Sequence, residues 1–258
     1  MKIYVLVKEV PDTYGDRKLD LETGLADRGA GDVVLDEITE RALEVALSYA
    51  DKNAGTEVVA LSMSPESATA SVRRALAIGA ASAVHVVDEQ LRGADLVLTA
   101  ATLAAAIRRG EPDLVITGNL STDGSGGVIP AMLAEHLGFT QATALSAVEI
   151  AEGQISGTRS GDAGTQQVTA ALPAVISITE ALPDARFPNF KGIMAAKKKP
   201  LEVLSLADLG VSADPAETPH TIMTAVSEKP PRAAGVKIVD EGDAAAQLVE
   251  FLAQNRLV

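Results

Sequence analysis

The sequence Asp113-Leu-Val-Ile-Thr-Gly-Asn-Leu-Ser-Thr-Asp-Gly-Ser-Gly-Gly127 joins a short apolar run to a glycine-rich segment. Residues 114–117 are typical of a buried strand, and residues 128–137 have the composition of a helix that ends at Gly138. A strand followed by a turn and a helix is the repeating unit of α/β proteins. This stretch therefore predicts one strand of a parallel sheet and the helix that covers it.

The same alternation extends towards the N-terminus. Apolar runs predict strands at residues 3–7, 57–62 and 83–87. Helical periodicity predicts helices at residues 36–50, 65–79 and 96–108. Strands that alternate with helices form a parallel sheet with right-handed crossovers. The predicted fold class is therefore α/β, with a parallel-sheet, Rossmann-like domain.

The pattern changes after about residue 145. Short runs predict an antiparallel meander at residues 147–150, 154–160 and 167–172. The apolar run at residues 173–178 predicts one more buried strand. We therefore expect a small antiparallel addition to the parallel sheet, and the predicted α/β domain spans residues 1–204.

Residues 205–258 are predicted to form a C-terminal arm. Four prolines interrupt this region, which is too many for a compact core: Pro215, Pro219, Pro230 and Pro231. Residues 243–255 form an amphipathic pattern that predicts a terminal helix. A short helix cannot bury its apolar face alone, so this face must lie on its own domain or on a partner.

The composition excludes several classes of function. The chain is 47% hydrophobic but only 3% aromatic, which predicts an aliphatic core. Its net charge of −13 argues against general nucleic-acid binding, which needs a basic face. With no cysteine, the chain has no disulfide, no cysteine-ligated metal and no thiol nucleophile. The first apolar run is too short for a signal peptide or a membrane span, so we expect a cytoplasmic protein.

The glycine-rich segment after residue 117 is a candidate phosphate site. Glycines let the backbone approach a ligand closely, and the free N–H groups of the following helix favour an anion. No lysine follows the glycines and the G-x-G-x-x-G spacing is absent, so the loop matches neither a Walker A loop nor a dinucleotide fingerprint. A phosphate there is expected to meet neutral donors. A plain glycine-rich connection remains the alternative interpretation.

The sequence offers no recognisable catalytic or metal-binding motif. None of the three histidines, His85, His136 and His220, has a partnered serine or aspartate at a known spacing. Each is expected to be structural or exposed. We therefore predict no catalytic residues and no metal site, which favours a binding or carrier subunit over an enzyme.

Residues 186–200 combine apolar side chains with the densest positive charge in the chain. Pro188, Gly192 and Pro200 predict that this segment has no regular structure. An irregular, mobile loop that carries apolar anchors beside cations is typical of a docking surface. A loop folded over the core, with ordinary solvated lysines, is the alternative.

Several segments resemble the electron transfer flavoprotein β subunit, in the same order along nearly the whole chain. They are Val7-Lys-Glu-Val-Pro-Asp12, Ala75-Leu-Ala-Ile-Gly-Ala80 after Arg73 and Arg74, residues 158–177 closing on Leu172-Pro-Ala-Val175, residues 186–203, Asp208-Leu-Gly-Val211, and Pro230-Pro-Arg-x-Ala-Gly-Val-Lys237.

The resemblance implies an adenine-nucleotide-binding domain within a heterodimer. In this family the β subunit buries a structural AMP, while the α subunit holds most of the FAD. The resemblance implies that electrons pass from acyl-CoA dehydrogenases and similar flavoenzymes, as in fatty acid oxidation, to a membrane quinone oxidoreductase. The arm and terminal helix at 205–258 would then wrap the α subunit.

The resemblance also places the family's functional residues on this chain. The AMP positions fall on Leu6, Val33, Val34, Leu35, Asp36, Met63, Gly118, Asn119, Leu120, Ser121, Thr122, Asp123, Gly124, Ser125, Gly126, Gly127, Val128 and Ile129. The partner-recognition loop falls on Phe190, Lys191, Gly192, Ile193, Met194, Lys197, Lys198 and Lys199, with Phe190 as the apolar anchor and the lysines as steering charges. Positions that carry aromatic residues near the flavin in some members fall on Thr13 and Leu35, and neither is aromatic.

Three alternatives stay open at the level of sequence. A related class binds FAD in place of AMP and bifurcates electrons from NADH. A nucleotide-hydrolysing enzyme on the same fold is a second alternative, although a general base is missing. A nucleotide-sensing protein that forms a homodimer without flavin is the third.

Overall fold

The computed structural model describes residues 1–15, 17–214, 216, 220–232 and 234–258. These residues form two compact units, Met1–Thr224 and Ala225–Val258. Two of the four prolines that predict the C-terminal arm, Pro215 and Pro219, lie outside the described residues. The predicted division of the chain at residue 204 stays a prediction.

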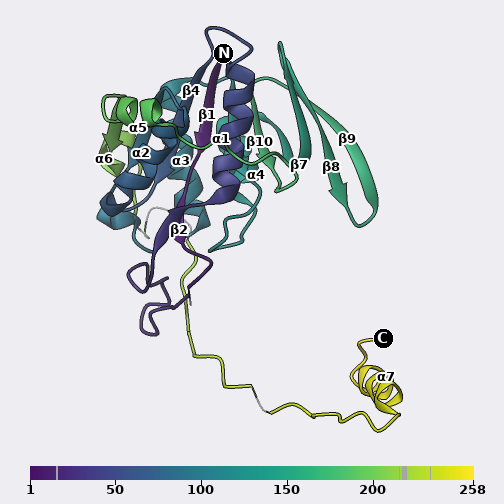
Figure 1. Cartoon of the computed structure of the whole chain (residues 1–258). Helices are drawn as coiled ribbons and strands as arrows, with labels where there is room; N and C mark the ends of the chain where they lie inside the picture. The colour runs from purple at the N-terminus through teal and green to yellow at the C-terminus, as the bar shows by residue number, and fades with distance from the viewer. Residues whose placement is uncertain (16, 215, 217–219, 233) are drawn as a thin grey trace. The chain divides into compact units, whose positions relative to one another are not determined.

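Within the described residues, nine strands form one sheet and two form a small separate sheet (Figure 1). The order of the large sheet is β11-β5-β4-β1-β6-β10-β7-β8-β9. Its parallel strands are β1 (Lys2–Leu6), β4 (Glu57–Met63), β5 (Ser82–Val86), β6 (Leu114–Gly118), β10 (Ala174–Ile178), β11 (Leu201–Leu204) and the start of β7 (Thr140–Ala151). The strands β8 (Gln154–Gly161) and β9 (Gly164–Ala171) continue it as an antiparallel meander. The predicted parallel sheet with an antiparallel addition is confirmed.

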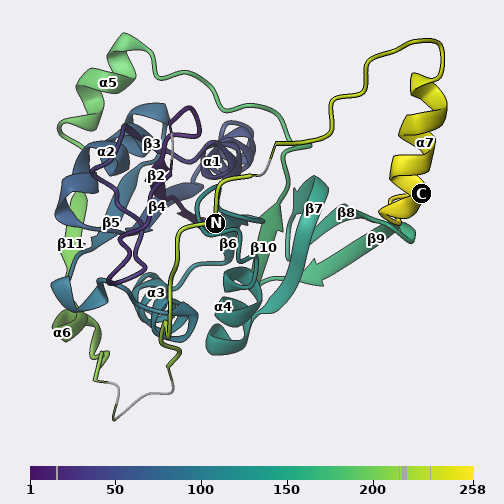
Figure 2. The same cartoon turned by 90° about the horizontal axis from the view of Figure 1, so that it is seen from below.

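Helices cover both faces of the large sheet. Figure 2 looks along the strands and shows α1 (Glu37–Ala50) and α2 (Thr69–Ile78) on one face, with α3 (Leu96–Gly110) and α4 (Ile129–Leu137) on the other. The remaining helical elements are η1 (Glu66–Ala68), η2 (Glu89–Leu91), α5 (Phe190–Ala196), α6 (Leu206–Leu209) and α7 (Ala244–Gln254). Among the described helices, none combines the length and apolar composition needed to cross a lipid bilayer.

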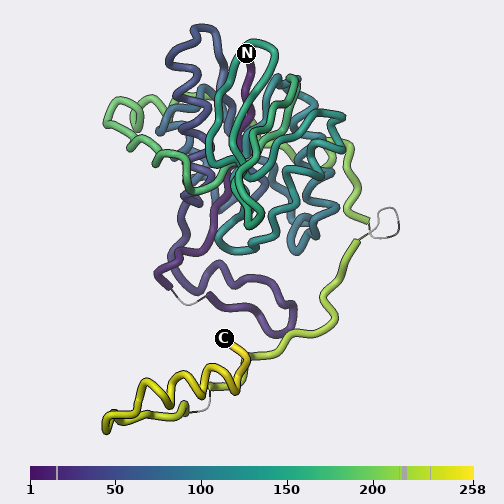
Figure 3. The backbone as a smooth tube through the Cα atoms, turned by 90° about the vertical axis from the view of Figure 1, so that its right-hand side faces the viewer, coloured from purple at the N-terminus to yellow at the C-terminus, as the bar shows by residue number. Residues whose placement is uncertain are grey.

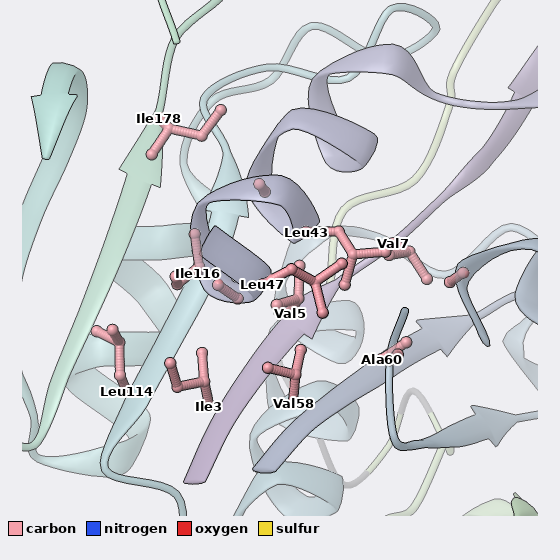
Figure 4. Packing of buried hydrophobic residues seen from close by; sticks show 14 of the residues in the cluster. Ile3, Val5, Val7, Leu43, Leu47, Val58, Ala60, Leu114, Ile116 and Ile178 are labelled. Atoms are coloured by element: carbon pink, nitrogen blue, oxygen red, sulfur yellow. The ribbon is translucent and has the colours of Figure 1, made fainter. Parts of the chain in front are cut away.

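The core is aliphatic, as the composition predicts. Alternate residues of the central strands point to opposite faces, so each parallel strand contributes to two apolar layers. Figure 4 shows one layer, in which Ile3 and Ile116 from the sheet lie beneath Leu43 and Leu47 of α1. The second layer packs Tyr4 and Leu61 against the α3 side of the sheet. These layers fix the strand ends that carry the candidate site.

A long excursion leaves the sheet after β1. Residues 9–35 contain β2 (Glu9–Pro11) and β3 (Val33–Leu35), which pair antiparallel and return the chain to the start of α1. The connection between β2 and β3 extends beyond the carboxyl ends of the parallel strands, as the tube in Figure 3 shows. The excursion therefore lies at the edge where ligands bind in such sheets.

The prediction that residues 186–200 lack regular structure is wrong, because α5 lies within them. Pro188 lies before the helix and therefore interrupts no helical hydrogen bond. The Asn189 side chain caps the N-terminus of α5 by accepting the N–H of Gly192 at 2.8 Å. Gly192 lies within α5, at the point where this helix crosses α2 closely. A Cβ at this position would lie 2.5 Å from the carbonyl oxygen of Ala77, so the crossing requires glycine.

The C-terminal unit contains α7. None of the described residues of this helix is buried, and its larger apolar side chains, Leu248, Val249 and Phe251, are exposed. The predicted terminal helix is therefore present, and Leu248, Val249 and Phe251 are exposed within its own unit.

Candidate functional site

The strand order has a switch point between β1 and β6. From β1 the chain moves outward through β4 to β5, and then returns to the other side of β1 to form β6. Connections that leave neighbouring strands in opposite directions open a crevice at their carboxyl ends, which is where α/β sheets bind ligands. The glycine-rich segment follows β6 directly, so it borders this crevice.

The loop between β6 and α4 is shaped by a tight turn. Its Ser125 N–H donates to the carbonyl of Ser121 at 3.0 Å. Gly127 has φ +68, and a Cβ there would lie 2.7 Å from the Leu120 side chain, so this position also needs glycine. Leu120 and Val128 of the loop are exposed, whereas Thr122 and Asp123 are partly buried beneath it. Thr122 and Asp123 are therefore the more buried polar residues of the loop, whereas Ser125 is exposed.

Three cations among the described N-terminal residues contact the loop, and the expectation that a phosphate meets neutral donors stays a prediction. Lys8, two residues beyond β1, donates from Nζ to Asp123 Oδ1 at 2.7 Å and to Ser121 Oγ at 3.3 Å. Arg28 donates to Asp123 Oδ2 at 3.3 Å. Arg17 donates to the carbonyl of Thr122. The sequence alone does not assign Lys8 to this site, because the assignment depends on β1 lying beside β6.

Asp123 balances these cations within the site. Burial disfavours its charge, but hydrogen bonds from Lys8, Ser121 and the Gly124 N–H and the charge of Lys8 outweigh burial and lower its pKa to about 2. The carboxylate is therefore ionised at neutral pH. Its cations remain partly exposed, with 39% of the Lys8 side chain and 36% of the Arg28 side chain accessible. The arrangement therefore places two partly exposed cations around one internal carboxylate.

Asp36 joins the excursion to the loop. It lies between β3 and α1, is 1% exposed, and accepts the Thr122 N–H on Oδ2 at 2.9 Å. Its own N–H donates to the carbonyl of Lys8 at 2.8 Å. Burial raises its pKa, against the hydrogen bond from Thr122. Asp36 therefore ties together the two segments that border the crevice.

The structure brings most of the predicted nucleotide positions to one edge. Leu6 and Met63 lie at the carboxyl ends of β1 and β4 and pack, partly buried, against the apolar layer beside Ile129. Val33 and Val34 are exposed on β3. The predicted residues of the loop, from Gly118 to Ile129, follow on β6 and the first turn of α4.

The two positions predicted near a flavin differ in access. Leu35 is 4% exposed and belongs to the core, so its side chain is unavailable to a ligand. Thr13 is exposed two residues beyond β2. Only Thr13 therefore offers a side chain, and its proximity to a flavin stays a prediction.

A second candidate surface lies on α5. Phe187, Phe190, Ile193 and Met194 are all exposed, and we call these four residues the α5 patch. Phe190 is the first residue of the helix and is 79% exposed. Large apolar side chains gathered on one exposed helix mark an interaction surface. Lys191, Lys197 and Lys198 are also exposed beside the patch.

Lys199 has a different environment from its neighbours, which corrects its assignment as a steering charge. Its Nζ donates to the carbonyls of Leu76 at 2.8 Å, Ala80 at 2.6 Å and Gly79 at 3.3 Å, at the end of α2. Burial lowers its pKa. A lysine at a helix C-terminus satisfies carbonyls that the helix leaves free. Lys199 therefore fastens the α5 segment to α2.

The other end of the α5 segment is fastened to α1. Arg186 forms two hydrogen bonds of 2.8 Å to the carboxylate of Glu44 and an ion pair of 2.9 Å to Asp51. Arg73 of α2 donates to the carbonyl of Ala196 at 3.0 Å. Bidentate arginine–carboxylate pairs hold geometry well. The α5 patch is therefore presented on a fixed base.

Two histidines and one surface hollow are not part of these two surfaces. His85 is fully buried, lies 2.9 Å from the Ser64 hydroxyl through Nε2, and has a pKa lowered by burial, as befits a structural histidine. His136 is exposed on α4. A hollow of about 880 Å³ between α1 and the β7–β8 turn contains none of the predicted site residues.

Comparisons with known proteins agree on one family. The model of the electron transfer flavoprotein domain matches residues 23–209. The chain is 46% identical to the electron transfer flavoprotein subunit beta of Mycobacterium bovis, over 99% of each chain. It is 35% identical to the protein of that name from Syntrophomonas wolfei, over 98% of this chain and 96% of the relative. It is also 33% identical to the caffeyl-CoA reductase-Etf complex subunit CarD of Acetobacterium woodii, over 82% of this chain and 81% of the relative.

Proposed function

The chain belongs to the electron transfer flavoprotein β-subunit family, and from this premise we propose the specific part that it plays in electron transfer. It pairs with an α subunit that holds most of the FAD, and it binds a structural AMP in the crevice between β1 and β6. The heterodimer takes electrons from acyl-CoA dehydrogenases and similar flavoenzymes and delivers them to a membrane quinone oxidoreductase.

One observation carries the nucleotide proposal. The glycine-rich loop and the cations Lys8 and Arg28 meet at the carboxyl edge of neighbouring strands β1 and β6. Backbone N–H groups and partly exposed cations are the partners that a phosphate group takes in proteins. Leu6 and Met63 lie at the ends of β1 and β4, on the same edge, and supply apolar surface for a base. These features suit a ligand that is held in place.

The docking proposal rests on the α5 patch. Interfaces depend on a few large side chains in the centre of the contact, and Phe190 is the most exposed aromatic on α5. Lys191, Lys197 and Lys198 place positive charge beside it in a chain of net charge −13. Such a charge cluster accelerates association with an acidic partner surface. The patch therefore suits short encounters with an acidic flavoenzyme.

The arm is proposed to contact the α subunit. The apolar side chains of α7 are exposed within its own unit. A helix of this length gains most of its stability from packing its apolar face against another surface. Residues 205–258 are therefore assigned to wrapping the partner subunit.

Identification of the bound nucleotide tests this function. We expect that the chain, produced together with its α subunit and then denatured, releases one AMP and one FAD per heterodimer. Two FAD molecules per heterodimer would favour the electron-bifurcating alternative, with NADH as the donor. Turnover of AMP or ATP by the pure heterodimer would instead favour a nucleotide-hydrolysing enzyme.

Lys8→Met is expected to weaken AMP binding about 10-fold, because a charge-assisted contact contributes about 1.4 kcal/mol. Methionine keeps the length and apolar stem of the side chain but removes the ammonium that faces Asp123. The measurement is titration calorimetry with AMP. Lys18→Met is the matched control, since Lys18 is exposed in the same excursion and has no role in the proposal. Equal affinities for both variants would contradict the role of Lys8.

A further inference from the structure

The α5 patch contains an exposed methionine next to its proposed anchor. Met194 is 47% exposed and lies four residues after Phe190 in the same helix. Residues four apart share one face of a helix, and a methionine sulfur makes favourable contacts with aromatic rings. Met194 and Phe190 therefore contribute to one apolar surface, and a partner that covers one of them also meets the other.

The packing of α5 on α2 holds Met194 at the surface. Ala196 is 4% exposed, and a Cβ at Gly192 would lie 2.5 Å from the carbonyl oxygen of Ala77 in α2. Arg73 of α2 donates to the carbonyl of Ala196 at 3.0 Å. A rotation of α5 that buried Met194 would break these contacts, because Gly192 and Ala196 would leave α2. The thioether therefore stays accessible to small solutes.

The other methionines of the chain provide an internal comparison. The chain has five methionines, and all five are described. Three of them are partly buried, whereas Met194 and Met223 are 47% and 49% exposed. The Met223 thioether packs against Gly24 of the N-terminal excursion, where a Cβ would overlap it. Exposure therefore makes both residues accessible to an oxidant, but only Met194 belongs to the α5 patch.

We infer that Met194 is a modification site at which oxidation by a peroxide weakens docking on the α5 patch. The inference rests on the proposed function, because it concerns the same docking surface. Hydrogen peroxide transfers one oxygen atom to Sδ of Met194. The O–O bond breaks, the sulfur lone pair forms an S–O bond, and the proton of the transferred hydroxyl passes to the leaving oxygen, which departs as water. The thioether is thereby oxidised to a sulfoxide and the peroxide is reduced.

The sulfoxide changes the α5 patch from apolar to polar beside Phe190. A polar oxygen that is buried in an apolar contact without a hydrogen-bond donor opposes binding. Methionine sulfoxide reductases convert the sulfoxide back to the thioether, so the loss of docking is reversible. Met194 therefore links the rate at which the carrier accepts electrons to the amount of peroxide around it.

Treatment of the intact heterodimer with hydrogen peroxide tests the inference. The dose is one at which peptide mass spectrometry finds a sulfoxide at Met223 in most molecules, and we expect Met194 to be oxidised in parallel. We expect kcat/KM for reduction by the proposed partner, an acyl-CoA dehydrogenase, to fall about 5-fold, and to recover after incubation with methionine sulfoxide reductases. Reduction by dithionite should stay unchanged, since dithionite needs no docking surface.

Three variants separate the effect of Met194 from that of Met223. Met194→Leu removes the sulfur and keeps an apolar side chain, so its treated and untreated samples should be reduced at the same rate, whatever that rate is. Met223→Leu should lose activity on treatment as the wild type does. Met194→Gln places a polar amide at the same position and should lower kcat/KM about 5-fold without any peroxide. Both positions are exposed, so each variant should fold as the wild type does.

Failure of the inference is distinguishable from failure of the proposed function. The inference is overturned if Met194 stays unmodified while Met223 is oxidised, if the oxidised wild type keeps its untreated rate, or if Met194→Leu loses activity on treatment as the wild type does. The docking proposal stands in each of these cases, provided that Phe190→Ala slows reduction. If Phe190→Ala is reduced at the wild-type rate, the docking proposal itself fails and the inference fails with it.

Discussion

Phe190→Ala is expected to lower kcat/KM for reduction of the heterodimer by the proposed partner, an acyl-CoA dehydrogenase, about 30-fold. An aromatic side chain at the centre of a small interface contributes about 2 kcal/mol, and 1.4 kcal/mol corresponds to a factor of ten. Phe190 makes no contribution to the core, since its side chain is 79% exposed on α5. We therefore expect the loss to be confined to docking, with flavin content, AMP content and thermal stability at wild-type values. Stopped-flow reduction with the dehydrogenase in excess measures the effect.

Phe187→Ala is the matched control for this experiment. Phe187 is an equally large and even more exposed aromatic, but it lies before α5 and outside the rigid helix. Direct reduction of the flavin by dithionite checks that the redox centre itself is unchanged. Wild-type reduction kinetics in Phe190→Ala would remove the docking role, and a larger effect of Phe187→Ala would move the anchor to that residue.

Lys199→Met is expected to destabilise the protein by about 2 kcal/mol, because three hydrogen bonds to a charged group are lost and buried carbonyls are left unpaired. The affected carbonyls belong to Leu76, Gly79 and Ala80 at the end of α2. For a domain of this size the midpoint of thermal unfolding falls by roughly 4–8 °C. Calorimetry or circular dichroism at one fixed protein concentration measures it.

Lys198→Met provides the contrast, one position earlier in the chain. Lys198 is exposed, so its removal is expected to leave the unfolding midpoint unchanged. The same substitution should reduce the association rate with the dehydrogenase and flatten its dependence on salt concentration. If both variants unfolded at the same temperature, the carbonyl contacts of Lys199 would have no role in stability.

The α/β fold could be predicted from local sequence because its signals are local. The strand at residues 114–117 begins with three consecutive apolar residues, and Gly138 ends the following helix. The helix α5 could not be predicted in this way. Gly192 disfavours a helix by its intrinsic propensity, and only the crossing with Ala77 makes glycine necessary there. Tertiary packing therefore reversed the local preference.

Part of the candidate site could also be predicted from local sequence, and part of it depends on the fold. The glycine-rich loop is continuous in sequence, so its glycines and hydroxyl side chains can be recognised without a structure. Lys8 and Arg28 lie 115 and 95 residues away from Asp123, and their role depends on β1 lying beside β6. Adjacency in the sequence groups Lys199 with Lys197 and Lys198. Its ammonium instead lies against the end of α2, which no pattern of charges reveals.

Because both ends of the α5 segment are held in place, binding of a partner there would cost little conformational entropy. A disordered segment must lose conformational entropy when it binds, and this loss slows or weakens association. The segment around α5 is already ordered, since Arg186 holds one end on α1 and Lys199 holds the other on α2. A partner that docked on Phe190, as proposed, would therefore restrict few additional rotatable bonds. The lifetime of that encounter would then depend mainly on the small apolar contact, and the carrier would leave soon after the electron had moved.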